Sequence, residues 1–94
     1  MTTMIIFHEV EDGERWAKGW QKGSGSRHEL VAKGGVTAAR AFRDPENPNS
    51  TGLIWEVSDM EKLQAFMETD EAKQAMAEDG LKVETLRMLV ESAS

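Results

Sequence analysis

Along the chain, apolar residues recur at the spacing of a strand in some segments and of a helix in others. The two halves of the chain contain these segments in the same order. In each half an extended apolar run leads into a helical pattern, and a glycine stop then opens directly into a second extended run. The two stops are the segments 32–36 and 77–81. The repeat therefore predicts two strand-helix-strand units.

Four strands are expected, over 4–10, 36–42, 52–57 and 83–90, because these runs are rich in residues that favour extended backbone. The first run is continuously apolar, which is typical of a central strand. Two prolines and two asparagines in 44–50 predict a turn that joins the second and third strands as a hairpin.

Each helical pattern begins with residues that are typical of a helix N-terminus. The first starts at Asp12, and the second starts with Ser58 and Glu61 at the spacing of a capping box. Thr69 is a typical N-cap residue, and we expect it to bend or restart the second helix.

A run with sequence KGSGS, residues 22–26, interrupts the first helix before the helical pattern resumes over 27–32. This run lacks the lysine and hydroxyl ending of a P-loop and does not directly follow a strand. A hinge or lid over a cavity is the favoured interpretation, and a phosphate cradle is the alternative.

The predicted order β-α-β-β-α-β is that of an α+β, ferredoxin-like sandwich, here a single domain spanning 1–94. Its four-stranded antiparallel sheet carries the helices on one face only. A bare sheet face with Ile and Val side chains is unfavourable in water, so we expect this face to pack against a second copy of the chain. The expected partner is therefore the protein itself, as a homodimer.

Composition narrows the possible functions. The net charge of -6, from 17 acidic and 11 basic side chains, disfavours nucleic acid and anionic membranes as partners. Absence of cysteine excludes disulfides, thiolate metal sites and cysteine nucleophiles. With two histidines, no metal site is expected. We read no signal peptide and no bilayer-spanning run, so a cytoplasmic protein is expected.

Three segments resemble a known superfamily: GLIWEVSD at 52–59, LQAFMETDE at 63–71 and AEDGL at 77–81. The pattern is similar to that of dimeric α+β barrel proteins, which include antibiotic-biosynthesis-monooxygenase-like, YciI-like and stress-responsive barrel proteins. The resemblance covers the whole domain. It implies a dimer with its site between sheet and helices or inside the barrel, and activities such as cofactor-independent oxygenation, haem degradation, cyclisation or isomerisation. Monooxygenase-like members often carry a histidine where this chain has Phe66.

Strand alternation predicts that four titratable side chains share the uncovered sheet face: His8, Arg40, Glu56 and Arg87. Charges buried between two sheets are unfavourable unless they are paired. In one interpretation the set is a site, where Glu56 orients His8 as a catalytic base while Arg40 or Arg87 binds an anionic oxygen of the substrate. In the other, Glu56 pairs across the dimer interface and has no catalytic role.

The leading hypothesis is a homodimer that binds a compact apolar or aromatic metabolite and acts without a cofactor as a monooxygenase, isomerase or cyclase. Trp16, Trp20 and Trp55 would form the walls of the binding site, or would simply be core residues. The alternative is a non-enzymatic dimerisation or ligand-sensing module. The sequence leaves open whether the protein is an enzyme and which small molecule it binds.

Overall fold

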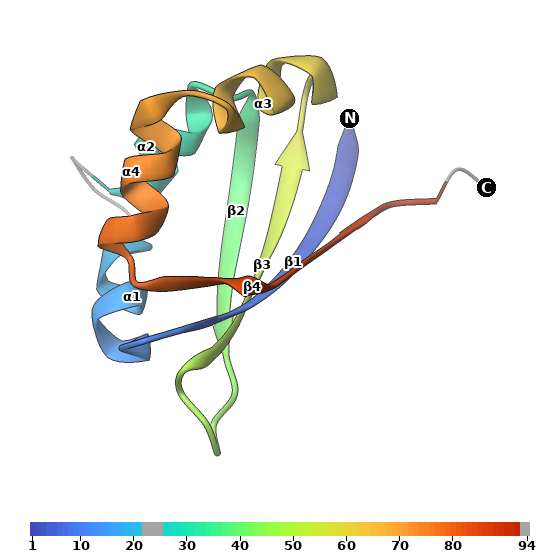
Figure 1. The fold of residues 1–94 in the computed structure, drawn as a ribbon. Coiled ribbons are helices and arrows are strands. Elements are labelled where there is room, and N and C mark those ends of the chain that lie inside the picture. Colours follow the sequence, from blue (N-terminus) through green and yellow to red (C-terminus); the bar gives the residue numbers. More distant parts are fainter. Residues whose placement is uncertain (22–25, 93–94) are drawn as a thin grey trace.

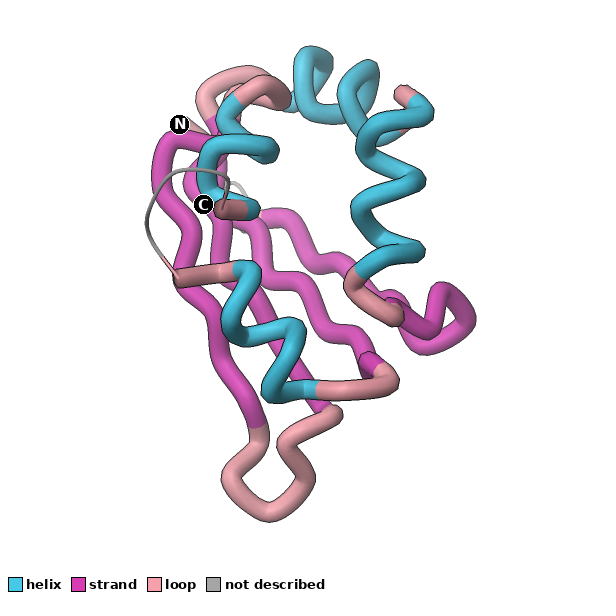
Figure 2. Tube along the Cα trace, turned by 90° about the vertical axis from the view of Figure 1, so that its left-hand side faces the viewer, coloured by secondary structure: helices cyan, strands magenta, loops and turns pink. Residues whose placement is uncertain are grey.

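The computed structural model describes residues 1–21 and 26–92, and its elements follow the predicted order. They are β1 (Thr2–Val10), α1 (Gly13–Gly19), α2 (Arg27–Ala32), β2 (Val36–Arg43), β3 (Ser50–Val57), α3 (Met60–Met67), α4 (Asp70–Glu78) and β4 (Leu81–Val90). The antiparallel sheet has strand order β2-β3-β1-β4, with β1 inside it. The described helices all lie on one face of the sheet (Figure 1, Figure 2). The predicted α+β, ferredoxin-like arrangement is confirmed.

Side-chain oxygens cap the N-termini of α1, α3 and α4, and one predicted cap was wrong. Asp12 and Asp59 each accept hydrogen bonds from two backbone N–H groups of the following turn. The cap of α3 is thus one residue later than the expected capping box, because the Ser58 hydroxyl donates to the carbonyl oxygen of Gly35 at 3.0 Å instead. Thr69 caps α4 as predicted.

Both glycine stops are confirmed by backbone conformation. Gly35 has a φ of 84° and Gly80 a φ of 69°, in the left-handed region that disfavours side chains with a Cβ. The expected hinge, lid or phosphate cradle at 22–26 lies outside the described residues apart from Ser26, which is the N-cap position of α2. In the part of the chain that the structure describes, no helix has the length and apolar character needed to cross a bilayer.

The direction of the β1 side chains differs from expectation. His8 and Ile6 are buried beneath the helices, whereas Ile5 and Phe7 are exposed on the bare face. Arg40, Glu56 and Arg87 lie on the bare face as predicted, but β1 is displaced by one residue relative to the other strands. Continuous apolar character in 4–7 carries no period-two signal, so this strand takes its phase from pairing, with His8 opposite Thr51 and Ile6 opposite Leu53.

The core fills the space between the helices and the covered sheet face. Its aromatic centre is a row of indoles, with Trp16 and Trp20 centroids 6.3 Å apart and Trp20 and Trp55 centroids 6.2 Å apart. Trp16 is among the most deeply buried side chains. One residue of α1, the residue that follows this helix and one strand residue therefore make the centre of the core, and they come from opposite halves of the chain.

Candidate functional site

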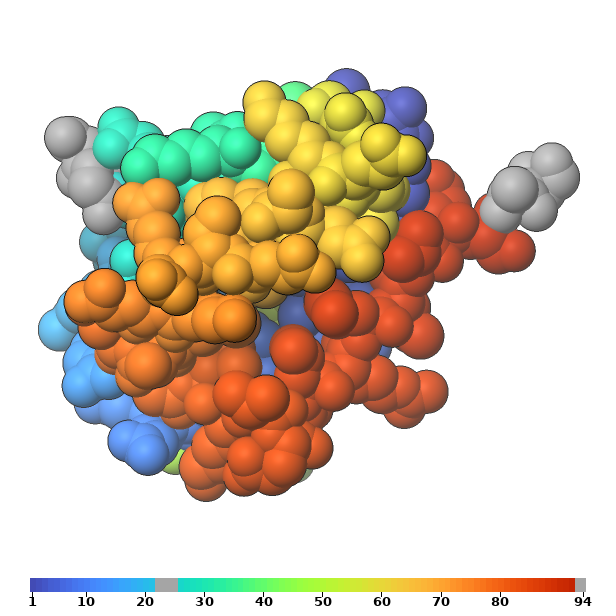
Figure 3. Space-filling model, turned by 45° about the horizontal axis from the view of Figure 1, so that its top comes forward, coloured from blue at the N-terminus to red at the C-terminus, as the bar shows by residue number. Residues whose placement is uncertain are grey.

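A cavity of about 80 Å³ lies between the covered sheet face and the helices. Its wall is mostly apolar and draws on β1, β3 and β4 of the sheet and on the helices above it. Residues of both α4 and β4 line it, and Figure 3 shows a recess between these two elements with atoms of β1 at its floor. The polar side chains on the wall are His8, Arg27 and Asp79, together with the N–H groups of two indoles.

His8 is held in one orientation by Thr51, its partner across β1 and β3. The Thr51 hydroxyl donates to the backbone carbonyl of His8 at 2.8 Å, and its oxygen lies 2.5 Å from Nδ1 of the same residue. A hydroxyl has a single proton to donate, so Nδ1 must be the donor in the second contact. The ring is therefore the Nδ1–H tautomer, and Nε2 carries the free lone pair.

Burial keeps this imidazole neutral. Loss of solvent lowers the pKa of His8 below its usual value, although its backbone hydrogen bond and the charge of Asp79 oppose the shift. The ring edge also packs on Trp16, with centroids 5.6 Å apart. Among the described residues none hydrogen-bonds Nε2, so this atom is a base without a protein partner in an apolar wall.

The three tryptophans that sequence analysis selected all line the cavity. Trp20 and Trp55 are buried, and the Nε1 atom of each has no hydrogen-bond acceptor within the described part of the protein. An indole N–H can only donate, so each ring presents an unused donor. The walls of the site are thus aromatic but not wholly apolar.

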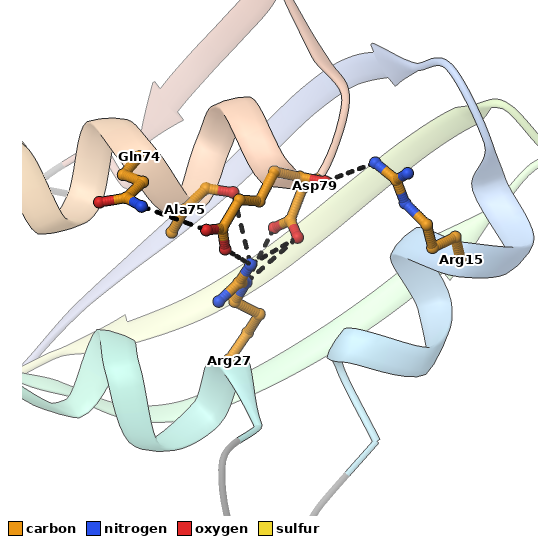
Figure 4. A network of polar contacts seen from close by, with 6 residues as sticks. Arg15, Arg27, Gln74, Ala75 and Asp79 are labelled. Carbon is orange, nitrogen blue, oxygen red and sulfur yellow. Dashed lines mark hydrogen bonds and ion pairs between the residues drawn. The ribbon is translucent and has the colours of Figure 1, made fainter.

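Arg27 and Asp79 form an ion pair at the cavity that sequence analysis did not find (Figure 4). Nη2 of Arg27 lies 2.8 Å from Oδ1 and Nε lies 3.0 Å from Oδ2, a bidentate geometry that joins α2 to the end of α4. These hydrogen bonds raise the pKa of Arg27. Arg15 in α1 donates to the backbone carbonyl of Glu78 beside the pair. Arg27 and Asp79 are 52 positions apart, so no short stretch of the sequence indicates that they pair.

The remaining predicted site residues lie on the opposite side of the sheet. Glu56 accepts two contacts from the Thr3 hydroxyl, at 2.9 and 3.0 Å, and Arg40 lies over the Phe42 ring at 5.2 Å. Arg87 is exposed, in register with Phe7 of β1.

The predicted grouping of His8 with Glu56, Arg40 and Arg87 on one face is therefore wrong. The displaced phase of β1 is the reason: His8 lies opposite Thr51 and contacts its hydroxyl, whereas Glu56 lies opposite Thr3.

A break in strand pairing lies beside His8. The register between β1 and β4 shifts between Phe7 and Glu9, and the Thr85 hydroxyl compensates by accepting from the Glu9 N–H at 2.8 Å. Such bulges bend the strand and redirect neighbouring side chains. Within residues 1–21 and 26–92, no three His, Asp or Glu side chains are grouped as metal ligands would be.

No known protein-family model and no curated protein matches this sequence. Solved structures share its fold over almost the whole length. A crystal structure of an antibiotic biosynthesis monooxygenase is 17% identical with a TM-score of 0.64, covering 100% of this chain and 99% of that one. SnoaB, a cofactor-independent oxygenase from Streptomyces nogalater, is 14% identical with a TM-score of 0.67, covering 99% and 92%. HapK from Hahella chejuensis is 15% identical with a TM-score of 0.67, covering 100% and 93%. The chain therefore shares the α+β, ferredoxin-like fold of these solved structures.

Proposed function

We propose that the protein binds a compact apolar or aromatic molecule in the cavity between sheet and helices, and that His8 removes a proton from it. The observation that carries this proposal is the neutral, buried imidazole of His8 on an apolar cavity wall, with Nδ1 engaged by Thr51 and Nε2 free to accept a proton. A base must be deprotonated before it can act, and the lowered pKa of His8 ensures this at neutral pH.

The chemistry follows from this geometry. Nε2 takes a proton from an acidic C–H or O–H group, and the substrate is left as a carbanion, enolate or phenolate. Asp79, whose charge favours protonated His8, stabilises the imidazolium that forms. Isomerisation and cyclisation both start from such an anion, and reprotonation by His8 completes the proton balance.

Oxygenation starts from the same anion. A carbanion derived from a CH2 group adds dioxygen, and the proton returned by His8 gives a hydroperoxide. Loss of water then leaves a ketone, so that CH2 and O2 become C=O and H2O. The shared fold with a cofactor-independent oxygenase supports this branch as the first to be tested.

We also propose that the chain is a homodimer that pairs through the bare sheet face. This face exposes 38% of Ile5, 46% of Phe7, 43% of Phe42 and 44% of Leu89. Exposed apolar side chains of this size on one face are typical of an interaction surface. On this proposal Arg40, Glu56 and Arg87 belong to the interface and not to the cavity.

The proposed proton transfer is tested with 2-tetralone, an aromatic ketone with acidic C–H groups, in deuterated water. Proton NMR follows deuterium incorporation next to the carbonyl, and an oxygen electrode follows uptake of dioxygen. We expect faster exchange with wild-type protein than with His8→Gln, while His28→Gln retains the wild-type rate.

Two results would contradict the enzymatic proposal. Equal exchange rates in wild type and His8→Gln would remove His8 as the base. Binding of 2-tetralone without exchange would instead favour a ligand-sensing module, the alternative left open by the sequence.

A further inference from the structure

We propose that the indole N–H groups of Trp20 and Trp55 bind oxygen atoms of the substrate, and that this substrate is a neutral ketone or phenol that becomes an oxyanion when His8 deprotonates it. The inference rests on the proposed function, since it concerns the molecule in the same cavity. It adds the chemical class of that molecule and gives the two tryptophans a role beyond that of walls.

The first step of the argument concerns unused donors. Trp20 is 8% exposed and Trp55 is 5% exposed, and neither Nε1 meets an acceptor in the described part of the protein. Folded proteins pair nearly all buried donors, because an unpaired buried N–H has lost its hydrogen bond to water without replacement. Both rings form part of the cavity wall, so a bound molecule is well placed to supply the missing acceptors.

The second step concerns charge. Arg27 is the one lysine or arginine among the described cavity-lining residues, and Asp79 already occupies its guanidinium with bidentate contacts. A carboxylate or phosphate ligand would therefore find no free cation and would be repelled by Asp79. The ligand that fits this wall is uncharged before the reaction and offers carbonyl or hydroxyl oxygen to an N–H donor.

The third step connects the donors with catalysis. Hydrogen bonds to an anionic oxygen are stronger than those to a neutral one, so the two indoles favour the enolate or phenolate over the bound ketone or phenol. His8 removes the proton and the indoles hold the resulting negative charge. The same donors would discriminate against a hydrocarbon of equal shape, because such a ligand leaves them unpaired.

Binding is measured with three ligands of one shape: 2-tetralone, the hydrocarbon tetralin and the anion 1,2,3,4-tetrahydro-2-naphthoate. We expect 2-tetralone to bind about tenfold more tightly than tetralin, the difference typical of one good hydrogen bond. The carboxylate should bind more weakly than either. Equal affinity for ketone and hydrocarbon, or a preference for the carboxylate, would overturn the inference.

Indole signals in 1H,15N correlation spectra report on the donors directly. With 2-tetralone, the N–H signals of Trp20 and Trp55 should move downfield, while tetralin should leave their proton shifts nearly unchanged. Trp20→Phe and Trp55→Phe should each reduce the preference for the ketone, whereas Trp16→Phe should alter both affinities in parallel. If a phenylalanine variant does not fold, the wild-type spectra alone decide the matter.

The two proposals fail in different ways. If 2-tetralone and tetralin bind alike but exchange remains dependent on His8, the oxyanion role of the indoles is wrong and the proton transfer stands. If none of the three ligands binds up to its solubility, both are wrong.

Discussion

Nδ1 of His8 lies 2.5 Å from the hydroxyl oxygen of Thr51, and the same hydroxyl donates to the backbone carbonyl of His8 at 2.8 Å. One threonine thus selects the tautomer of the histidine and fixes its ring against the sheet. Both residues are buried, so water cannot substitute for either contact without entering the core. The base proposed for the cavity is therefore oriented by a residue on the neighbouring strand.

Removal of that hydroxyl tests this relationship. In Thr51→Val we expect the unfolding free energy to fall by about 1–2 kcal/mol, because Nδ1–H loses its acceptor in the core. We also expect 15N shifts of the ring to indicate a mixture of tautomers in place of Nδ1–H alone. Thr37→Val, on the exposed part of β2, is the control and should change stability by less than about 0.5 kcal/mol. A pure Nδ1–H ring in Thr51→Val would show that Thr51 does not select the tautomer.

Stability should depend on pH through His8. Its pKa is lowered in the folded state, whereas in the unfolded chain it returns to about 6.5. Between these two values the unfolded chain binds more protons, so the unfolding free energy rises with pH there and falls as the solution is acidified from about pH 6.5. Urea titrations from pH 5 to 8 should show this slope in wild type. The slope should be smaller in His8→Gln, and an unchanged slope in that variant would contradict the assignment.

The Arg27 and Asp79 pair should influence both the fold and the base. In Asp79→Asn, Arg27 remains partly buried and keeps only the longer carboxylate contact of its Nη2 with Oε2 of Glu78 at 3.5 Å, and we expect a loss of about 1–2 kcal/mol in unfolding free energy. Because the charge of Asp79 raises the pKa of His8, the same variant should lower that pKa further, as an NMR titration would detect.

Glu71→Gln is the matched control, since Glu71 pairs with Lys33 at 3.0 Å on the surface with both side chains more than half exposed. It should cost less than about 0.5 kcal/mol. A pKa of His8 that is unchanged in Asp79→Asn would argue against electrostatic contact between the two residues.

Two glycines of α1 should respond in opposite ways to the same substitution. A Cβ on Gly13 would lie 1.8 Å from the carbonyl oxygen of Pro48, so Gly13→Ala must displace backbone and should cost about 2–4 kcal/mol. On Gly19 the nearest atom is 3.5 Å away, so Gly19→Ala should stabilise the helix by about 0.5–1 kcal/mol. Thermal unfolding of the two variants compares them directly, and equal melting temperatures would contradict this packing.

The oligomeric state tests the bare sheet face. Light scattering at micromolar concentration should give the mass of two chains for wild type. Ile5→Glu places a charge on this face between Ile54 and Leu89, its apolar neighbours on β3 and β4, and should give the mass of one chain, because a buried unpaired carboxylate is strongly unfavourable. Ala77→Glu adds the same charge to the exposed side of α4 and should remain dimeric. A monomeric wild type would remove the homodimer from the proposal.

Local signals were sufficient for much of the fold. The alternation of β3 and the glycine stops at Gly35 and Gly80 depend on residues close in sequence, and these predictions are confirmed. The structure separates the predicted residues of the candidate site into two groups. The three tryptophans were identified from their size and aromatic character, and they do line one cavity. Glu56 was grouped with His8 through an assumed phase of β1, and that grouping failed.

The sequence by itself determined the order of the elements, the ends of most helices and the existence of one covered and one bare sheet face. Each of these follows from backbone preferences and from the periodicity of apolar residues within a short stretch of sequence. Only the tertiary structure decided which face His8 occupies, since a strand that is apolar at every position of 4–7 takes its direction from pairing with β3 and β4. It also decided that Thr51 contacts His8 and that Asp79 pairs with Arg27 at the cavity, because contacts between residues more than forty positions apart depend on how the sheet and helices close over one another.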